Sequence, residues 1–277
     1  MGESAYGVVK LDGSGAPLEI HKPKPWHGWR EFLKEYVIIV VGVLTALAGE
    51  QVAESFHTRH VIAEAEAAMR AELVGDDLPQ AYVRVVVAPC LASDLRRLRQ
   101  AVGDRAPAET FGPLAAAYDP PKRTWDMSAW TSTLSGAASS RMNSDHLLAW
   151  SQDYVLVPQL QAAQTQEVHA LSRLQLTRFR SGAWSAQRAD ELNDAIDDLE
   201  EANRSMTLLA AGLTTFTEKD GIAIAPPDRA NLLKAARKGY GGCAVEPDPA
   251  ALQRALGQVR TRQDHQELNR ALGVDRK

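Results

Sequence analysis

An uncharged apolar run from Tyr36 to Gly49 differs from the rest of the chain, where apolar and polar residues mostly alternate every three or four positions. With its flanks, the run extends into a helix from about Phe32 to Ala53, close to the roughly 20 residues that cross a bilayer. Aromatic residues precede it at helical spacing, as they do at membrane interfaces: Trp26, Trp29, Phe32 and Tyr36. The pattern predicts a membrane anchor over residues 29–53.

Basic residues lie mainly on the N-terminal side of this run: Lys22, Lys24, Arg30 and Lys34. The positive-inside rule makes residues 1–28 a cytoplasmic tail and residues 54–277 an exported domain. Two alternatives stay open. A run this short also suits the buried core helix of a soluble protein. Ala46-Leu47-Ala48 has the form of a signal-peptide cleavage site, although Glu31 and Glu35 disfavour a signal peptide.

The apolar positions after the anchor predict an all-α fold, in which an antiparallel helical bundle with a long helical hairpin follows a single transmembrane helix. The helix that leaves the anchor is expected to weaken at Gly75-Asp76-Asp77 and Pro79, and Pro89 is expected to start or kink the next helix. Prolines and glycines make residues 103–123 a long connection with one short helix at about residues 114–117, the most favourable place for a binding loop.

The predicted hairpin pairs two long helices. The first is expected to begin at Ser144 or Asp145, to bend at Pro158 and to end near Arg180, and Ser185 is expected to cap the second. The second helix has apolar residues at heptad-like spacing: Leu192, Ile196, Leu199, Ala202, Met206, Leu209, Leu213 and Phe216. This spacing predicts coiled-coil-like packing of the two helices.

Shorter elements complete the expected bundle. A turn at Ser181-Gly182 closes the hairpin, and helices are expected at residues 125–139 and 228–238 and from about Pro249. Residues 222–224 could pair briefly with another extended segment.

Composition and charge narrow the possible partners. The chain has 277 residues, 45% of them hydrophobic, and a formal net charge of −4 without a basic stripe, so we expect no nucleic-acid partner. Its two cysteines, Cys90 and Cys243, lie too far apart for a Cys-x-x-Cys redox or zinc motif. In an exported domain such a pair usually forms a disulfide, which we expect here. Two buried free thiols are the alternative.

Small residues form one stripe on the predicted anchor, where Gly42, Ala46 and Gly49 recur at helical spacing beside Thr45. Small side chains allow helix backbones to approach closely in lipid. The stripe therefore predicts that the anchor, besides contacting the lipid bilayer, packs against another membrane protein or a second copy of the chain. The alternative is the ordinary composition of membrane helices, in which Gly and Ala are common.

Metal-binding patterns are sparse. Glu54, His57 and His60 share one helical face, as transition-metal ligands would, but a di-iron bundle needs the Glu-x-x-His motif twice and this chain contains it once. We therefore expect solvated residues there and no metal site. One helix also carries an acidic ridge, which we expect to be a solvated face: Asp190, Asp194, Asp197 and Glu201.

No common catalytic motif occurs in the sequence, which lacks G-x-S-x-G, a P-loop, His-Glu-x-x-His and a Rossmann fingerprint. We therefore expect no catalytic residues and no cofactor. Four aromatic residues are candidates for lining a small-molecule site between helices: Trp125, Trp130, Trp150 and Tyr154.

Two patterns resemble an uncharacterised family of bacterial single-span envelope proteins. The first is Trp29-Arg-Glu-Phe-Leu-Lys-Glu35, followed by the Ile/Val run and Gly42-Val-Leu-Thr-Ala-Leu. The second is Trp130-Thr-Ser-Thr-Leu-Ser-Gly136, with Asn143-Ser-Asp145 and Tyr154. The resemblance implies the bacterial inner membrane, with the N-terminus in the cytoplasm and a helical domain in the periplasm. It implies no reaction and no ligand.

The sequence therefore predicts a membrane-anchored, non-enzymatic helical interaction module, an accessory subunit of an inner-membrane or envelope complex. A periplasmic domain that binds or senses a small molecule is the alternative, and an enzyme is the least favoured interpretation.

Overall fold

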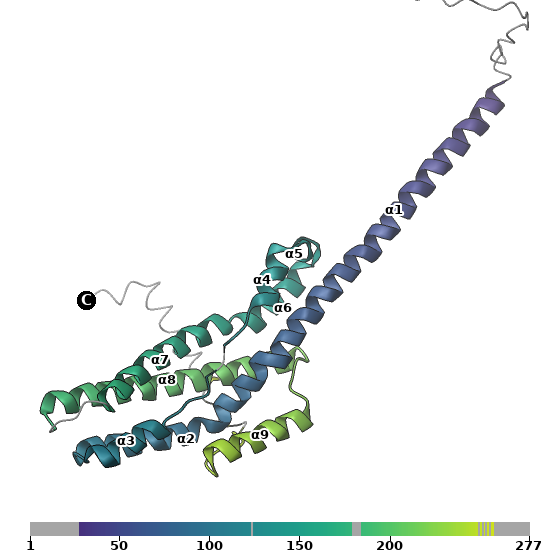
Figure 1. The fold of residues 1–277 in the computed structure, drawn as a ribbon. Coiled ribbons are helices and arrows are strands. Elements are labelled where there is room, and N and C mark those ends of the chain that lie inside the picture. Colours follow the sequence, from purple (N-terminus) through teal and green to yellow (C-terminus); the bar gives the residue numbers. More distant parts are fainter. Residues whose placement is uncertain are drawn as a thin grey trace, which may run out of the picture. The chain divides into compact units, whose positions relative to one another are not determined.

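The computed structural model describes residues 28–122, 124–178 and 184–248, together with residues 250, 252, 254, 256 and 257. Within these residues the fold is all-α, as predicted (Figure 1). No strand forms among them, so the brief pairing expected at residues 222–224 does not occur. The chain divides after Phe56 into two compact units, and helix α1 (Trp29–Glu72) contributes to both.

The described part of the N-terminal unit is a helix with almost entirely exposed side chains. An apolar window of 18 residues near the N-terminus is long enough to cross a membrane, and none of it is buried by the chain. The Phe32 ring lies 6.0 Å from that of Trp29 and 6.3 Å from that of Tyr36, between centroids. These three predicted interfacial aromatics therefore share one face of α1. The fourth, Trp26, lies outside the described residues.

In the second unit the helix continues past Gly75-Asp76-Asp77 and Pro79, where it was expected to weaken, and its geometry changes there. It passes through one π-helical turn, η1 (Leu73–Asp77), into α2 (Leu78–Gly103). Pro89 lies inside α2 instead of starting it. A proline inside a helix removes one backbone hydrogen bond. Near Pro89, two carbonyl groups of α2 accept hydrogen bonds from other parts of the chain. The Val86 carbonyl accepts from the Val245 N–H, and the Ala88 carbonyl accepts from the Asn203 amide.

The segment after α2 is more helical than predicted. Helix α3 (Ala108–Ala117) begins six residues before the short helix expected at residues 114–117. The single helix expected at residues 125–139 is instead two, α4 (Ser128–Ser135) and α5 (Ala137–Arg141), separated by Gly136. A Cβ atom at Gly136 would lie 2.9 Å from the Ser132 carbonyl oxygen, so the close approach at this break requires glycine.

The first helix of the predicted hairpin is also divided, into α6 (Ser144–Tyr154) and α7 (Val157–Arg178). Pro158 occupies the first turn of α7, where its missing N–H costs little, so the chain is interrupted where a bend was expected. The Asn143 side chain caps α6 by accepting from the N–H groups of Asp145 and His146, and the predicted caps at Ser144 or Asp145 are therefore wrong by one or two residues.

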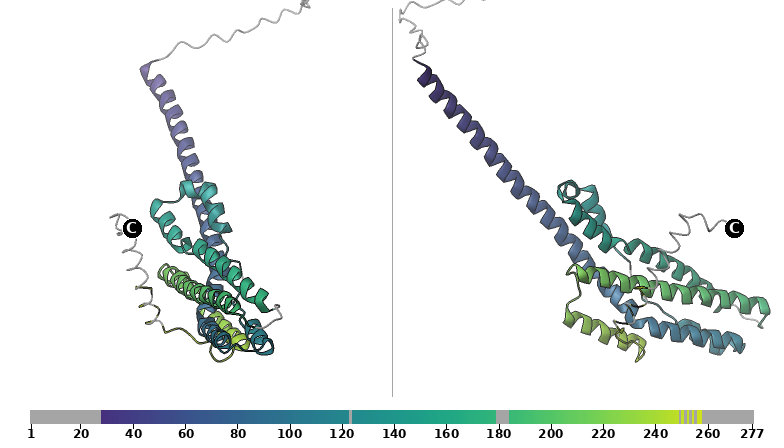
Figure 2. Two further views of the ribbon diagram at one scale, coloured as in Figure 1. Left: turned by 90° about the vertical axis from the view of Figure 1, so that its left-hand side faces the viewer. Right: turned by 180° about the vertical axis from the view of Figure 1, so that it is seen from behind.

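Helix α8 (Ala186–Lys219) pairs with α7 as predicted, and α2 packs along α8 on another side (Figures 1 and 2). The Ser185 hydroxyl accepts from the Arg188 N–H at 3.1 Å, which confirms the predicted cap. The turn expected at Ser181-Gly182 and the helix start at Pro249 lie outside the described residues. Helix α9 (Pro226–Tyr240) is slightly longer than predicted. Gly241 follows its last residue and has a φ of 84°, which favours glycine.

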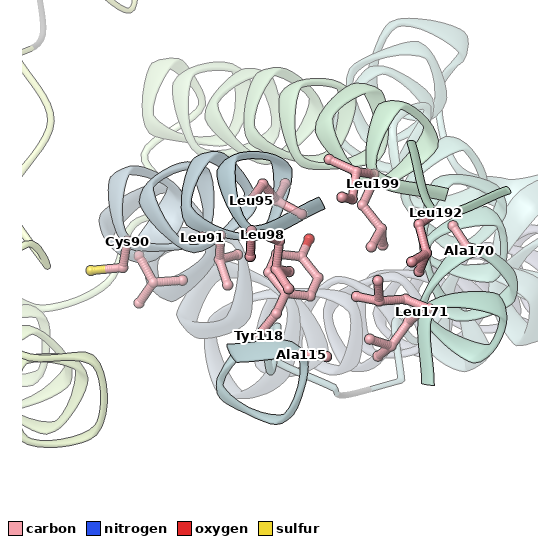
Figure 3. Close-up of a cluster of buried hydrophobic side chains, with 14 of the residues drawn as sticks. Cys90, Leu91, Leu95, Leu98, Ala115, Tyr118, Ala170, Leu171, Leu192 and Leu199 are labelled. Carbon is pink, nitrogen blue, oxygen red and sulfur yellow. The ribbon is translucent and has the colours of Figure 1, made fainter. Parts of the chain in front are cut away.

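Two hydrophobic cores lie along α8. One core surrounds Leu91 and Leu98 of α2 and Tyr118, the residue after α3. It includes Leu192 and Leu199 of α8 (Figure 3). The other gathers the end of α1, η1, α4, α6 and the second half of α8. The predicted seam of α8 is buried in these cores except at Leu209, which is half-buried, and Phe216, which is exposed.

Candidate functional site

The small-residue stripe is open in the structure. Gly42, Ala46 and Gly49 are exposed on α1. A Cβ atom added at Gly42 or Gly49 would meet no described atom within 4 Å. The Thr45 hydroxyl donates to the Val41 carbonyl at 2.8 Å, so its proton is already used inside the helix. The stripe can therefore accept a neighbouring helix through close backbone packing.

The four predicted ligand-site aromatics lie in one buried cluster. Trp125, Trp130, Trp150 and Tyr154 are each at most 9% exposed and belong to the same hydrophobic core. The rings of Trp130 and Tyr154 stack with centroids 5.6 Å apart. The sequence thus identified residues that meet in space, and the structure packs them as core side chains. Ligand binding by this cluster stays a prediction.

A polar cluster adjoins these aromatics at the π-helical turn. The Glu72 carboxylate accepts from the Ser128 hydroxyl at 2.7 Å and from the Ala129 N–H at 2.8 Å. Its other oxygen lies 2.8 Å from the Tyr154 hydroxyl. Met127, the N-cap residue of α4, makes no side-chain cap bond. Glu72 of α1 supplies the N-terminal cap of α4 in its place.

Asp77 holds the segment that leads into α4. Its Oδ1 accepts from the Asp126 N–H at 3.1 Å, while Oδ2 has no hydrogen-bond partner among the described residues although Asp77 is 0% exposed. Asp126 in turn accepts from the N–H groups of Met127 and Ser128. Burial raises the pKa of the Asp77 carboxyl to about 7, and the nearby carboxylate of Glu72 adds to this increase.

A second carboxyl pair lies near the same cluster. Burial, together with the charge and hydrogen bonding of Asp220, raises the pKa of Asp153 to about 7, and Arg70 acts in the opposite direction. Arg70 also donates to the Gly221 carbonyl at 3.1 Å. Sequence analysis missed both clusters. The available signal was an acidic residue at a core-facing helical position, such as Glu72 beside Leu73.

A separate buried ion pair joins α2, α7 and α8. Arg84 and Glu167, 1% and 2% exposed, meet in a two-pronged contact of 2.6 and 3.1 Å. Arg84 also donates to Asn203 at 3.2 Å. The Tyr118 hydroxyl lies 3.5 Å from Glu167, and burial raises the pKa of Tyr118 above its ordinary range. Such an enclosed network fixes how helices pack.

A groove of about 610 Å³ lies between α2 and α8 and is bordered by the chain after α9. Its lining is largely apolar, with charged residues among it: Ala88, Pro89, Ala92, Leu95, Arg96, Glu200, Asn203, Arg204, Thr207, Leu208, Pro247, Asp248 and Leu252. Its volume lies within the range of small-molecule sites.

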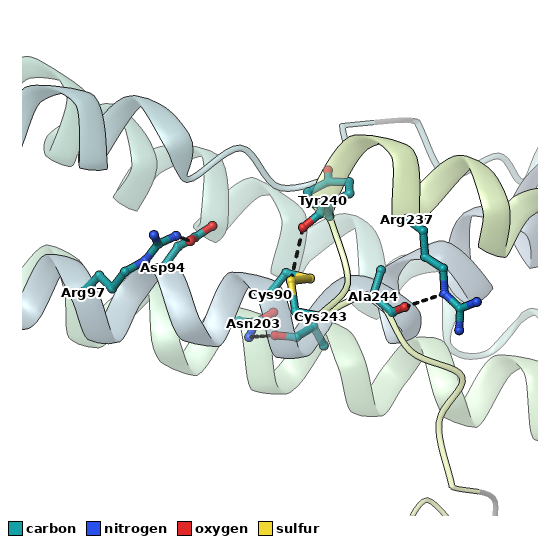
Figure 4. The surroundings of a disulfide bond; sticks show 9 residues. Cys90, Asp94, Arg97, Asn203, Arg237, Tyr240, Cys243 and Ala244 are labelled. Atoms are coloured by element: carbon teal, nitrogen blue, oxygen red, sulfur yellow. Dashed lines mark hydrogen bonds and ion pairs between the residues drawn. A yellow bond between two sulfur atoms is a disulfide. The ribbon is translucent and has the colours of Figure 1, made fainter.

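The two cysteines form a disulfide, as predicted, so the free-thiol alternative is wrong (Figure 4). Cys90 lies buried in α2, and Cys243 follows α9 on the exposed surface. The Val245 N–H donates to the Val86 carbonyl, and Arg237 donates to the Ala244 carbonyl. Disulfide and hydrogen bonds together hold the chain after α9 against α2, next to the groove.

The weak metal candidates remain separate surface residues. Glu54, His57 and His60 are exposed, and Nε2 of His60 lies 3.2 Å from Oε1 of Glu64. No group of three or more potential ligands within the described ranges is placed to hold a metal ion. The acidic ridge is partly neutralised, since Asp197 pairs with Arg99 and Glu201 with Arg204.

Comparison with known proteins gives no relative: no family model, curated protein or solved structure matches the chain.

Proposed function

We propose that the chain is a non-enzymatic interaction module anchored in a bacterial inner membrane. Residues 29–53 span the bilayer, residues 1–28 lie in the cytoplasm and the helical domain lies in the periplasm. The unburied apolar window of the long helix carries this proposal. Exposed apolar surface of this extent is unfavourable in water and is expected where lipid or a membrane partner covers it.

The disulfide supports the exported location of the helical domain. Cys90 and Cys243 form a bond, which persists in oxidising compartments and is rare in the cytosol. The open stripe at Gly42, Ala46 and Gly49 supports the interaction role, because it lets a second membrane helix approach closely. The partner is another membrane protein or a second copy of this chain.

Co-purification from native membranes in mild detergent tests the proposal. The full-length protein should retain a stoichiometric integral-membrane companion or crosslink to a second copy. Gly42→Ile and Ala46→Ile should reduce this association several-fold without lowering the amount inserted. Ala48→Ile is the size-matched control, since Ala48 lies roughly 120° around the helix from Gly42. Equal loss in control and stripe variants, or no association at all, would refute the anchor contact.

A second candidate function, small-molecule binding, is favoured by the α2–α8 groove. Native mass spectrometry of the purified full-length protein would reveal a bound compound as an added mass. Ala92→Trp places a large ring in the groove and should remove that mass, whereas Gln100→Trp on the exposed side of α2 should not. The same added mass in the Ala92→Trp protein would place the compound elsewhere.

A further inference from the structure

The π-helical turn η1 (Leu73–Asp77) is a candidate for conformational control. A π-turn within an α-helix is rare and frequently marks a functional position. Here acidic side chains stand at both of its ends, Glu72 before it and Asp77 as its last residue. Through Ser128, Ala129 and Asp126 both side chains bind the start of α4. The turn and the start of α4 are therefore held together by carboxyl groups.

Three other carboxyl groups lie close enough to Asp77 to act on its charge. Glu72 faces it from α1, Asp126 from the segment before α4, and Asp76 from η1 itself. The Tyr154 hydroxyl of α6 also interacts with the charge of Asp77. One Asp77 oxygen is buried without a hydrogen-bond partner. A negative charge there would be poorly solvated and would face other carboxylates, whereas a neutral carboxylic acid would not.

We propose that this junction is a proton-binding site, in which a proton on Asp77 keeps α4, α5 and α6 packed on η1 and loss of the proton loosens them. The charged form gains solvation when the start of α4 moves away and water enters. That movement breaks the Asp126 N–H contact and weakens the external cap that Glu72 gives to α4. The Asp153–Asp220 pair acts in the same direction, because α6 carries Asp153 and Asp220 follows α8.

The proton-binding site would make the helical domain respond to the pH around it. The pKa of Asp77, raised by burial to about 7, places its loss of a proton in the neutral range. The response depends on contacts within the second unit alone, so it can hold whether or not the anchor proposal is correct.

Hydrogen exchange of the full-length protein in lipid nanodiscs tests the proposal. After correction for intrinsic exchange, peptides from α4 and α6 should open more readily as pH rises. Loss of the Asp77 proton alone should increase the opening constant by up to about tenfold per pH unit between about pH 5 and 7, and the increase should level off above about pH 7. Peptides from α9, which lies outside this cluster, should show no such slope. A flat wild-type profile in α4 and α6 would overturn the proposal without any variant.

Two matched variants assign the effect to its residue. Asp77→Asn is nearly isosteric and cannot ionise, so its α4 peptides should show at least a several-fold smaller rise over the same pH range. Asp76→Asn changes an exposed carboxylate in the same turn and should keep most of the wild-type slope, because the Asp76 charge has the smallest effect on Asp77 among the neighbouring carboxylates. Circular dichroism verifies that each variant keeps its helices. An Asp77→Asn protein that is folded and keeps the full wild-type slope would overturn the proposal.

Discussion

At the scale of single residues, the core of this bundle contains charged side chains that compensate one another. Arg84 is among the largest fully buried side chains, and its partner Glu167 lies 83 positions away along the chain. Sequence spacing cannot reveal such a pair, because the two residues meet only once α2 and α7 have packed. The exposed pair of Arg173 and Asp198 is chemically similar but remains in solvent.

Loss of Arg84 should destabilise the fold strongly. Arg84→Met leaves Glu167 buried without its partner, and we expect the free energy of unfolding to fall by about 3–5 kcal/mol in urea titrations. Arg173→Met is the control and should cost less than about 1 kcal/mol. Changing Arg84 and Glu167 together to Met should recover much of the loss. A double variant as unstable as the single one would contradict this account.

Asp153 should make the protein less stable as pH rises. Its folded-state pKa of about 7 lies above the ordinary value of 3.8. The folded state therefore holds its proton over a range where the unfolded state has lost it. The resulting stabilisation is present below about pH 4 and is lost as pH rises through about 7. Asp153→Asn should make the fall in melting temperature between about pH 5 and 8 smaller without removing it, because Asp77 titrates in the same range. Asp145→Asn on the exposed start of α6 should leave the wild-type slope.

The disulfide should contribute substantially to stability, because it closes a loop with a sequence separation of 153 residues. We expect the Cys90→Ser, Cys243→Ser double variant to lose at most about 4–5 kcal/mol of unfolding free energy. Non-reducing electrophoresis should show a compact monomer that slows on reduction. Two thiols reactive toward maleimide in the unfolded, unreduced protein would contradict the bond. This pair was predictable, since only two cysteines are present and the domain was expected to be exported.

At the scale of helices, periodicity and caps predicted α8 and its pairing with α7 well. The sequence failed where a helix boundary depends on tertiary contacts. Pro89 was expected to start or kink a helix, yet it lies inside α2, and the Asn203 amide donates to the Ala88 carbonyl beside it. Asp77 was expected to be part of a weak point, yet it lies within a continuous helical path from α1 to α2 and accepts a hydrogen bond from the Asp126 N–H. Both are local signals overridden by partners distant in sequence.

The seam of α8 offers a direct test of this distinction. Leu199 and Phe216 fit the same apolar period, but Leu199 is 0% exposed and Phe216 is 37% exposed. Leu199→Ala should lower the unfolding free energy by about 2–5 kcal/mol because it leaves a cavity in the core. Phe216→Ala should cost less than about 1 kcal/mol. Urea titration measures both losses. Similar losses from the two variants would show that Phe216 is packed as closely as Leu199 in solution.

At the scale of the whole molecule, the membrane anchor is the prediction on which the function depends. The stretch over residues 29–53 was recognisable from composition alone, because length and apolarity decide whether a helix can cross a bilayer. Apolarity does not distinguish an uncleaved anchor from a signal sequence, and both fit an exposed apolar helix near the N-terminus. Orientation rests on the basic residues that precede the run.

Topology mapping should resolve these alternatives. A phosphatase reporter fused after Lys277 should be active, because the enzyme requires export, and a fluorescent protein fused before Met1 should fluoresce in the cytoplasm. The intact chain should stay in the membrane pellet after a carbonate wash, since a spanning helix is not released by removing surface charge contacts. A shortened soluble product that begins at Gly49 would establish cleavage after Ala48. An inactive reporter on a soluble, full-length chain would instead favour a buried core helix, and the stripe at Gly42 would then need a partner within a soluble assembly.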